Sequence, residues 1–226
     1  MKREIIKTGD GSSTIYLPEW NEHYHSKHGA LQEAKHVFLK TGFHHFLEKT
    51  DAQALSILEI GFGTGLNALL TYFEAEGAGV SVDYTGVEAY PVSSKELEAL
   101  DYSEVISNKE ASEVFKSIHD AEWSKRVEIS AFFNLQKQQM FFSDIRAEGA
   151  YDLIYFDAFG PRVQPDLWTE KIFSLMYRAL KDDGVLVTYS AKGDVRRAMQ
   201  AVGFLVERLP GPPGKREMLR ATRKNP

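Results

Sequence analysis

The segment from Leu58 to Asn67 contains the residues best suited to hold a cofactor. Glycines at positions 61, 63 and 65 permit backbone angles, and a close approach to the main chain, that a Cβ atom would prevent. An apolar run precedes this loop and a helical pattern follows it. Such a strand–turn–helix corner binds adenosine-containing cofactors in nucleotide-binding α/β folds. We therefore predict that Gly61, Gly63 and Gly65 contact a cofactor.

The spacing of the glycines indicates which cofactor to expect. The loop has the pattern GxGxG, because Leu66 stands where the GxGxxG motif of dinucleotide-binding proteins has its third glycine. Glu59, an acid at the end of the preceding strand, would also repel a pyrophosphate. We expect S-adenosylmethionine, which has no phosphate group and carries a positive sulfonium.

Three acids stand at or just after the ends of other predicted strands. Glu88 follows Gly65 by 23 residues, where a carboxylate can accept hydrogen bonds from two ribose hydroxyls. Asp144 could accept a hydrogen bond from an adenine amino group, and Asp157 ends a buried-strand pattern. A single acid in such a place more often caps a helix, but three in register with a glycine loop favour a ligand site.

The residues after Asp157 indicate chemistry on an amine. Asp157-Ala158-Phe159-Gly160-Pro161 stands where methyltransferases of base amines often carry an Asp/Asn-Pro-Pro-aromatic turn. Asp157 would hold the amine and Phe159 would stack on the base. Because a carboxylate favours the protonated form of a nearby amine, Asp157 must also accept the departing proton or pass it to water. Positioning of the two reactants should supply much of the rate acceleration.

Composition narrows the class of protein. The chain has 226 residues, 43% of them hydrophobic and 26% charged, which is typical of a soluble domain with a full core. The sequence has no signal peptide and no apolar run of the roughly 20 residues needed to cross a bilayer. We therefore expect a cytoplasmic protein that does not associate with a membrane. The absence of cysteine excludes disulfides, thiolate metal sites and a cysteine nucleophile. The histidines clustered between residues 23 and 45 lack a recognisable ligand spacing, so we expect no metal.

Charge is distributed unevenly along the chain. Residues 192–226 contain nine Lys and Arg and three acids, a local charge of +6, while the remaining 191 residues carry −11. A basic edge on an acidic body fits contact with phosphates. A solubilising tail explains the same pattern equally well.

Strands and helices alternate along most of the chain, which predicts a mostly parallel sheet with right-handed crossovers. We expect an N-terminal hairpin and helix in residues 1–50, packed on a domain at residues 51–226. We therefore predict an α/β fold of the class I S-adenosylmethionine-dependent methyltransferase (Rossmann-like) type, whose sheet is closed by a C-terminal antiparallel hairpin. The predicted strands are 55–60, 81–87, 126–142, 151–157 and 184–190, the predicted helices are 30–40, 66–76, 91–120, 167–180 and 193–201, and the hairpin spans 204–222.

Six blocks between residues 20 and 222 together resemble the methyltransferase domain of the tRNA 5-methylaminomethyl-2-thiouridine biosynthesis enzymes. The blocks are Tyr24 to Leu39, Leu58 to Asn67, Glu88 to Pro91, Asp157 to Trp168, Gly193 to Arg197, and Gly214 to Leu219. Family membership implies methyl transfer from S-adenosylmethionine to the aminomethyl nitrogen of the wobble uridine of certain tRNAs. Residues 95–140 match poorly.

The resemblance and the residue patterns together give one set of expected site residues. Asp157 is the expected catalytic residue. The expected cofactor-binding residues are Tyr24, Glu59, Gly61, Phe62, Gly63, Gly65, Asn67, Glu88 and Asp144. The expected tRNA-binding residues are Asp157, Phe159, Lys215 and Arg216, the last two as a clamp on phosphates.

The chain also departs from the pattern of this family. Many relatives are fused to a flavin-dependent oxidase that prepares the amine, whereas this chain ends at Pro226 without a second glycine-rich loop. We therefore expect methyltransferase activity alone, no flavin, and a separate flavin oxidase or other enzyme as the supplier of the amine. Where relatives tend to have Asp-Gly-Phe-Ala-Pro, this chain has alanine at 158 and glycine at 160.

Two other functions stay open on the sequence. The first is a small-molecule amine methyltransferase or aminopropyltransferase, since residues 151–161 also resemble spermidine synthases. Those enzymes usually have acids directly after the strand to hold a polyamine, and Phe159, Gly160 and Pro161 supply none. The second is a non-catalytic Rossmann-like subunit, against which the intact glycines and acids argue.

Overall fold

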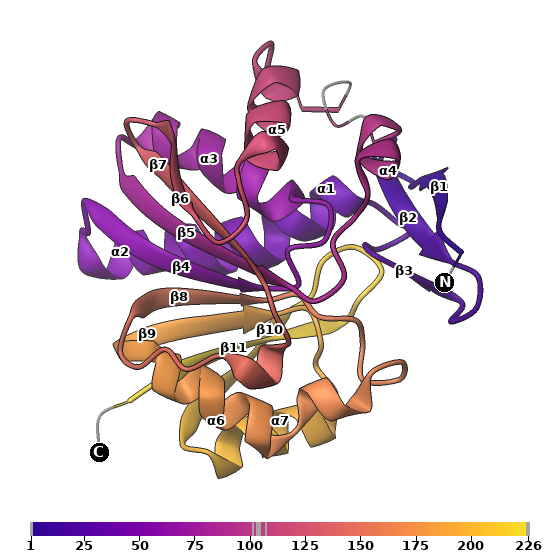
Figure 1. Cartoon of the computed structure of the whole chain (residues 1–226). Helices are drawn as coiled ribbons and strands as arrows, with labels where there is room; N and C mark the ends of the chain where they lie inside the picture. Colours follow the sequence, from indigo (N-terminus) through magenta and orange to yellow (C-terminus); the bar gives the residue numbers. More distant parts are fainter. Residues whose placement is uncertain (1, 101, 103–104, 107, 225–226) are drawn as a thin grey trace.

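An eight-stranded sheet forms the centre of the computed structural model, which describes residues 2–100, 102, 105–106 and 108–224 (Figure 1). The strand order is β10-β11-β9-β8-β4-β5-β7-β6. The strands are β4 (Ala54–Ile60), β5 (Ser81–Glu88), β6 (Arg126–Ser130), β7 (Phe133–Gln139), β8 (Tyr151–Phe156), β9 (Leu180–Thr188), β10 (Phe204–Pro210) and β11 (Glu217–Arg223).

The sheet is parallel in its middle and antiparallel at its two edges. Strands β9, β8, β4, β5 and β7 pair in parallel, while β6 pairs antiparallel with β7, and β11 with both β9 and β10. The chain enters this sheet at β4, continues outward through β5 and the β6–β7 pair, and returns to β8 on the other side of β4. Ligands of open α/β sheets bind at such a switch point, beside the carboxyl ends of the strands. The predicted parallel sheet and its closing hairpin are confirmed.

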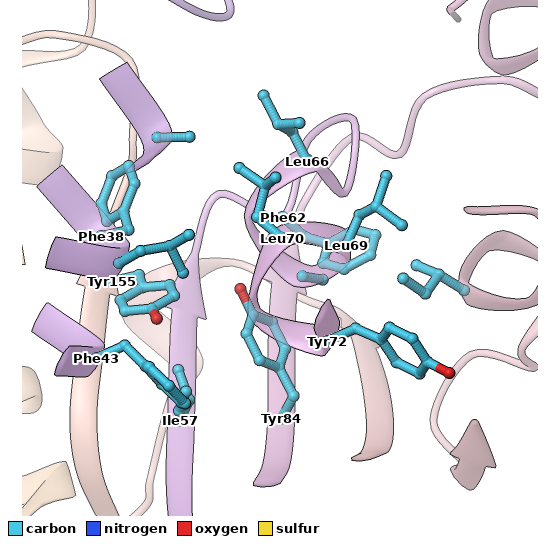
Figure 2. Close-up of a cluster of buried hydrophobic side chains, with 14 of the residues drawn as sticks. Phe38, Phe43, Ile57, Phe62, Leu66, Leu69, Leu70, Tyr72, Tyr84 and Tyr155 are labelled. Carbon is cyan, nitrogen blue, oxygen red and sulfur yellow. The ribbon is translucent and has the colours of Figure 1, made fainter. Parts of the chain in front are cut away.

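Two hydrophobic clusters lie on opposite faces of the sheet, because successive side chains of a strand alternate between its faces. Ile57 joins the cluster under α3 (Leu66–Ala78) and α5 (Ala111–Asp120), and its neighbour Leu58 joins the cluster under α6 (Glu170–Ala179) and α7 (Gly193–Ala201). Figure 2 shows the first cluster, in which Tyr84 and Tyr155 lie between the sheet strands and the helices.

The N-terminal segment forms a small sheet and a long helical stretch. Strands β1 (Glu4–Lys7), β2 (Ser13–Leu17) and β3 (Glu22–His23) are antiparallel, as predicted for the hairpin. The predicted helix at 30–40 continues to residue 50 as α1 (Ala30–Ala34), a π-helix η1 (Lys35–His44) and α2 (His45–Thr50). The helical stretch passes through Gly42 without a break. A Cβ there would lie 3.0 Å from the Val187 side chain, so the glycine permits close packing of the helix on the sheet.

The hydrophobic side chains of residues 30–50 belong to the same cluster as those of the sheet. Val37, Phe38 and Phe43 are buried against it. The helical stretch thus packs on the sheet as one layer of the main fold. The domain boundary at residue 51 stays a prediction.

The remaining elements are short and lie near the carboxyl ends of the parallel strands. They are α4 (Ser94–Glu98), η2 (Phe142–Asp144) and η3 (Pro165–Trp168). The predicted helical region 91–120 becomes α4 and α5, with residues 101, 103–104 and 107 of that region outside the described part. The helix predicted at 167–180 is divided at Thr169, which has an extended backbone before α6.

Candidate functional site

A pocket of about 1330 Å³ lies at the switch point, beside the loops that follow β4, β5, β7 and β8. The N-terminal segment supplies a further wall. The loop and N-terminal residues that line it include Gly61, Phe62, Gly63, Asn67, Glu88, Tyr90, Phe142, Asp157, Phe159, Trp20, Tyr24 and His25.

The glycine loop is tied to both neighbouring strands. The backbone N–H groups of Gly61 and Phe62 donate to the Val87 carbonyl, each at 3.0 Å. Gly61 has φ +91°, and a Cβ there would lie 2.6 Å from the Asp157 carbonyl oxygen. The glycine thus brings the loop directly against the backbone that presents Asp157. Gly61 and Gly63 line the pocket as predicted.

Gly65 serves the helix instead of the pocket. It precedes α3 with φ +74°, and a Cβ there would meet the His119 ring at 3.0 Å. Phe62 also turns its ring into the core, against His119 and Trp123, and is 3% exposed. Gly86 makes room for that ring, since a Cβ there would lie 2.2 Å from Phe62 Cδ2. The sequence patterns gave no sign of Gly86, because its partner is 24 residues away in the chain.

Glu88 presents a carboxylate at the end of β5. Its Oε2 accepts a hydrogen bond from the Gly63 N–H at 3.0 Å, and its Oε1 accepts one from the Tyr90 N–H at 2.9 Å. Each oxygen retains further acceptor capacity. The carboxylate is therefore held in one orientation and can still accept hydrogen bonds from a diol.

Asn67 joins two acids beside the pocket. Its Nδ2 donates to Glu59 Oε1 at 2.8 Å and to Asp157 Oδ2 at 2.9 Å. Glu59 is 1% exposed and accepts a second bond from the Tyr84 hydroxyl at 2.8 Å. Burial raises the pKa of Glu59 well above its usual value. Glu59 therefore lies behind the pocket wall and acts on the site through Asn67, whose buried Oδ1 has no hydrogen-bond partner within the described residues.

The Asp157 carboxyl titrates close to neutrality. Burial, and next the negative charge of Glu33, raise its pKa to about 7, while the Asn67 hydrogen bond and the Lys215 charge act in the opposite direction. A carboxyl with such a pKa can both take up and release a proton at physiological pH.

Aromatic side chains form a wall that adjoins the glycine loop, because a Cβ at Gly63 would lie 3.3 Å from the Tyr24 ring. The Phe159 ring lies between Trp20 and Tyr24, edge to face, with centroid distances of 5.6 and 5.0 Å. The Phe159 carbonyl accepts a hydrogen bond from Trp168 Nε1 at 2.8 Å, which fixes the loop after β8. Burial raises the pKa of Tyr24 to about 12, so its hydroxyl stays protonated at neutral pH.

Three further predicted residues lie outside this pocket. Asp144 is exposed, although Phe142 and Ser143 immediately before it line the wall. Lys215 forms an ion pair with Glu33, and Arg216 is exposed. Both basic residues line a second hollow of about 500 Å³ next to Gly160.

The pocket also contains residues that the sequence patterns did not indicate. His25 lies in its wall, with its Nδ1 3.0 Å from the Thr14 hydroxyl, and burial lowers its pKa to about 4, so it is neutral. Arg3 donates to Glu96 Oε2 at 3.1 Å and to the Tyr90 carbonyl at 3.0 Å. The positions of Arg3, Trp20 and His25 depend on how the N-terminal sheet docks, and no local pattern encodes that.

Comparison with known proteins identifies the family. A family described as S-adenosyl-L-methionine-dependent methyltransferase matches residues 108–224, which is more than half of the chain. The chain belongs to this family. The expected enzyme class and the methyl donor of the family are thereby confirmed, and the sheet described above is the class I methyltransferase fold that the sequence predicted.

Curated relatives carry the name that the sequence blocks suggested. The tRNA 5-methylaminomethyl-2-thiouridine biosynthesis bifunctional protein MnmC of Pseudomonas aeruginosa PAO1 is 30% identical over 221 residues, covering 90% of this chain and 32% of the relative. The MnmC protein of Azoarcus sp. BH72 is also 30% identical, covering 92% of this chain and 34% of the relative. The chain thus spans about one third of the length of these relatives.

Solved structures support the fold. A crystal structure of MNMC2 from Aquifex aeolicus has a TM-score of 0.80 at 23% identity, covering all of this chain and 72% of that one. The spermidine synthase of Thermotoga maritima has a TM-score of 0.57 at 14% identity, covering 98% of this chain and 68% of that one.

The structure also bears on metals and membranes. Within the described ranges, no three His, Asp or Glu side chains are grouped as a metal ion requires. In the same part of the chain, no helix combines the length and the apolar character needed to span a bilayer.

Proposed function

We propose that this methyltransferase methylates the nitrogen of the 5-aminomethyl group on the wobble (2-thio)uridine of tRNA, giving 5-methylaminomethyl(-2-thio)uridine. The observation that carries the proposal is the pairing of Asp157, a carboxyl with a pKa of about 7, with the aromatic wall at Phe159 in one pocket beside the glycine loop. The carboxyl suits an amine and the aromatic wall suits a flat base, and the MnmC relatives carry the name of this tRNA modification.

The residues of the pocket fit S-adenosylmethionine. The bare backbone at Gly61 and Gly63 would lie against the cofactor, and Glu88 would accept hydrogen bonds from its ribose hydroxyls. Asn67 Oδ1, a buried acceptor without a partner in the described chain, suits the ammonium of the methionine moiety. When bound, S-adenosylmethionine would supply an electrophilic methyl group attached to a sulfonium. Asp144, at the exposed end of η2, stays a proposed ligand of the adenine.

Asp157 and Phe159 would hold the reacting end of the tRNA. Phe159 would stack on the uracil ring, and the Asp157 carboxylate would accept a hydrogen bond from the amine. Because the amine must lose a proton, the ionised form of Asp157 is the active one, and it passes the proton to water. Exposed Arg216 would pair with a tRNA phosphate.

The proposed substrate also implies other proteins. A flavin oxidase or another enzyme would supply the aminomethyl uridine, and both activities would meet the tRNA in the cytoplasm. Aminopropyl transfer to a polyamine is the second candidate, because of the fold shared with spermidine synthase. The rings of Trp20, Tyr24 and Phe159 suit a flat base better than an aliphatic chain.

The test is methyl transfer with purified protein. The protein is incubated with S-adenosylmethionine carrying a labelled methyl group and tRNA bearing 5-aminomethyl-2-thiouridine, and the digested nucleosides are analysed by mass spectrometry. We expect one labelled methyl group on the wobble nucleoside and none on fully methylated control tRNA. Binding of S-adenosylmethionine without any labelled nucleoside, or transfer to putrescine from the decarboxylated donor, would contradict the proposal.

A further inference from the structure

Lys215 lies in the turn between β10 and β11, yet its ammonium points into the molecule. Its Nζ forms an ion pair with Glu33 of α1 and lies 3.8 Å from the centre of the Tyr189 ring. The side chains are 31% exposed for Lys215 and 9% for Glu33. A lysine held on both sides in this way is poorly placed to reach a phosphate in solvent.

The same contacts connect Lys215 to the loop that carries Asp157. The Tyr189 hydroxyl donates to the Ala158 carbonyl at 2.8 Å, directly after Asp157. Glu33 is fixed in turn, because its Oε2 accepts a hydrogen bond from the Ser26 N–H at 2.7 Å. Three distant segments of the chain therefore meet behind the catalytic carboxyl: α1, the end of β9 and the hairpin turn.

We propose that Glu33 and Lys215 are a positioning pair for Asp157, which holds the 157–161 loop in place through Tyr189 and sets two opposite charges behind the Asp157 carboxyl. Lys215 is then an internal electrostatic residue and not part of a phosphate clamp. The proposal rests on the proposed function only in taking the ionised Asp157 as the active form.

The surrounding charges explain why the pair is needed. The charge of Glu33 raises the pKa of Asp157 and that of Lys215 lowers it, so the two partners oppose each other while both are present, with Glu33 the stronger of the two. Loss of one partner leaves the other uncompensated in a poorly solvated place, where charges act strongly. The groups that face Asp157 from the packed elements are Glu33 on α1, Glu59 on β4, the Asn67 amide on α3, Tyr84 on β5, Tyr189 after β9, and Lys215 in the turn.

Two substitutions of similar size should move the titration of Asp157 in opposite directions. Lys215→Met leaves the Glu33 charge unpaired, and we expect the Asp157 midpoint to rise by about one pH unit. Glu33→Gln leaves the Lys215 charge unpaired, and we expect the midpoint to fall by a similar amount. The double variant should titrate between the two single variants, and Lys215→Arg, which keeps the positive charge, should keep the wild-type midpoint.

The midpoint is measured by NMR on protein labelled with ¹³C at the aspartate carboxyl carbon, with Asp157→Asn used for assignment. Arg216→Met is the matched control, because Arg216 is the exposed neighbour in the same turn. We expect no shift in this control, and circular dichroism establishes that each variant is folded. This measurement needs neither tRNA nor turnover, so its failure is distinguishable from failure of the proposed substrate.

A kinetic measurement separates the pair from a clamp. In Lys215→Met, the acid limb of the pH profile of kcat should move to higher pH, with the KM for tRNA and its salt dependence unchanged. Unmoved NMR midpoints in both folded single variants, or shifts of the same sign in both, would overturn the proposal. A raised tRNA KM with an unmoved midpoint would overturn it as well and restore Lys215 to the phosphate clamp.

Discussion

The pKa of Asp157 depends on groups that are far away in the sequence. The strand pattern before it predicted that it would reach the carboxyl edge of the sheet, and it does. Its pKa of about 7 depends on Glu33, 124 positions earlier, and on Lys215, 58 positions later. The sequence therefore predicted the residue and its place in the sheet, whereas its protonation depends on tertiary contacts that no local pattern contains.

Asp157→Asn should separate cofactor binding from catalysis. The asparagine keeps an oxygen that can accept from Asn67 Nδ2, so the pocket should keep its shape. It has no carboxylate to take up a proton, so we expect kcat to fall by about 100-fold or more, with the dissociation constant of S-adenosylmethionine nearly unchanged. Calorimetry and initial rates test this, and normal turnover would remove Asp157 from the mechanism.

The same substitution should make stability less dependent on pH. Because the folded-state pKa of Asp157 is about 7 and the ordinary value is 3.8, the folded protein retains a proton that the unfolded chain has lost between these values. Stability of the wild type should therefore fall as pH rises from about 4 to 7.

At pH 8 we expect Asp157→Asn to be more stable than the wild type by on the order of 4 kcal/mol, because each unit of pKa difference corresponds to about 1.4 kcal/mol. At pH 4, where the carboxyl is protonated in the folded protein, the two should differ little. Urea unfolding at both pH values measures the difference, and an equal difference at the two values would show that the carboxyl ionises without cost in the fold.

At the scale of elements, the loop after β4 was predicted well and its individual glycines less so. The pattern GxGxG located the pocket, and Gly61 and Gly63 line it. A Cβ at Gly61 or Gly63 would nevertheless meet the Asp157 backbone or the Tyr24 ring, and one at Gly65 or Gly86 would meet His119 or the Phe62 ring. A glycine that admits a ligand and one that admits a side chain look the same in a sequence, because both simply lack a Cβ.

Substitution of Gly61 by alanine should disrupt both the loop and cofactor binding. The new Cβ would lie 2.6 Å from the Asp157 carbonyl, and φ of +91° is unfavourable for alanine. We expect a loss of roughly 2 kcal/mol or more in unfolding free energy and a weakened affinity for S-adenosylmethionine.

Gly77→Ala is the matched control for Gly61→Ala. Gly77 lies in α3, and an alanine Cβ there would have no neighbouring atom within 4 Å, so the substitution should stabilise the helix by about 0.5–1 kcal/mol. Thermal unfolding and calorimetric titration compare the two variants. Equal effects of both substitutions would mean that the close contact with Asp157 does not constrain the loop.

At the scale of the whole molecule, the N-terminal sheet closes one side of the pocket. Arg162, in the loop after β8, donates through Nη2 to the carbonyls of Trp20 and Asn21 and to Glu22 Oε2. Arg3 makes the equivalent connection to Glu96 and the loop after β5. The hairpin was predictable from its turn residues, but its docking place was not, because long-range arginine contacts determine it.

Arg162→Met should loosen this side of the pocket while leaving the core intact. The substitution removes the hydrogen bonds that hold the segment around Trp20, so Trp20 and Tyr24 would pack less firmly on Phe159. We expect faster amide hydrogen exchange in β2 and β3, unchanged exchange in β4 and β5, and a higher KM for tRNA. Arg126→Met, which removes a surface pair with Asp83 on the far edge of the sheet, is the control. Identical exchange in wild type and Arg162→Met would show that the sheet docks without this arginine.

The order of the strands in the sheet also determines when each strand can pair during synthesis on the ribosome. Strand β11 is inserted between β9 and β10, and Lys215 stands at its entrance. A nascent chain can form β4, β5, β7 and β8 early, but β9 keeps an unpaired edge until residue 223 has emerged. Until the hairpin forms, the carboxyl at position 157 also lacks its cation, so catalytic competence should not precede the pairing of β11.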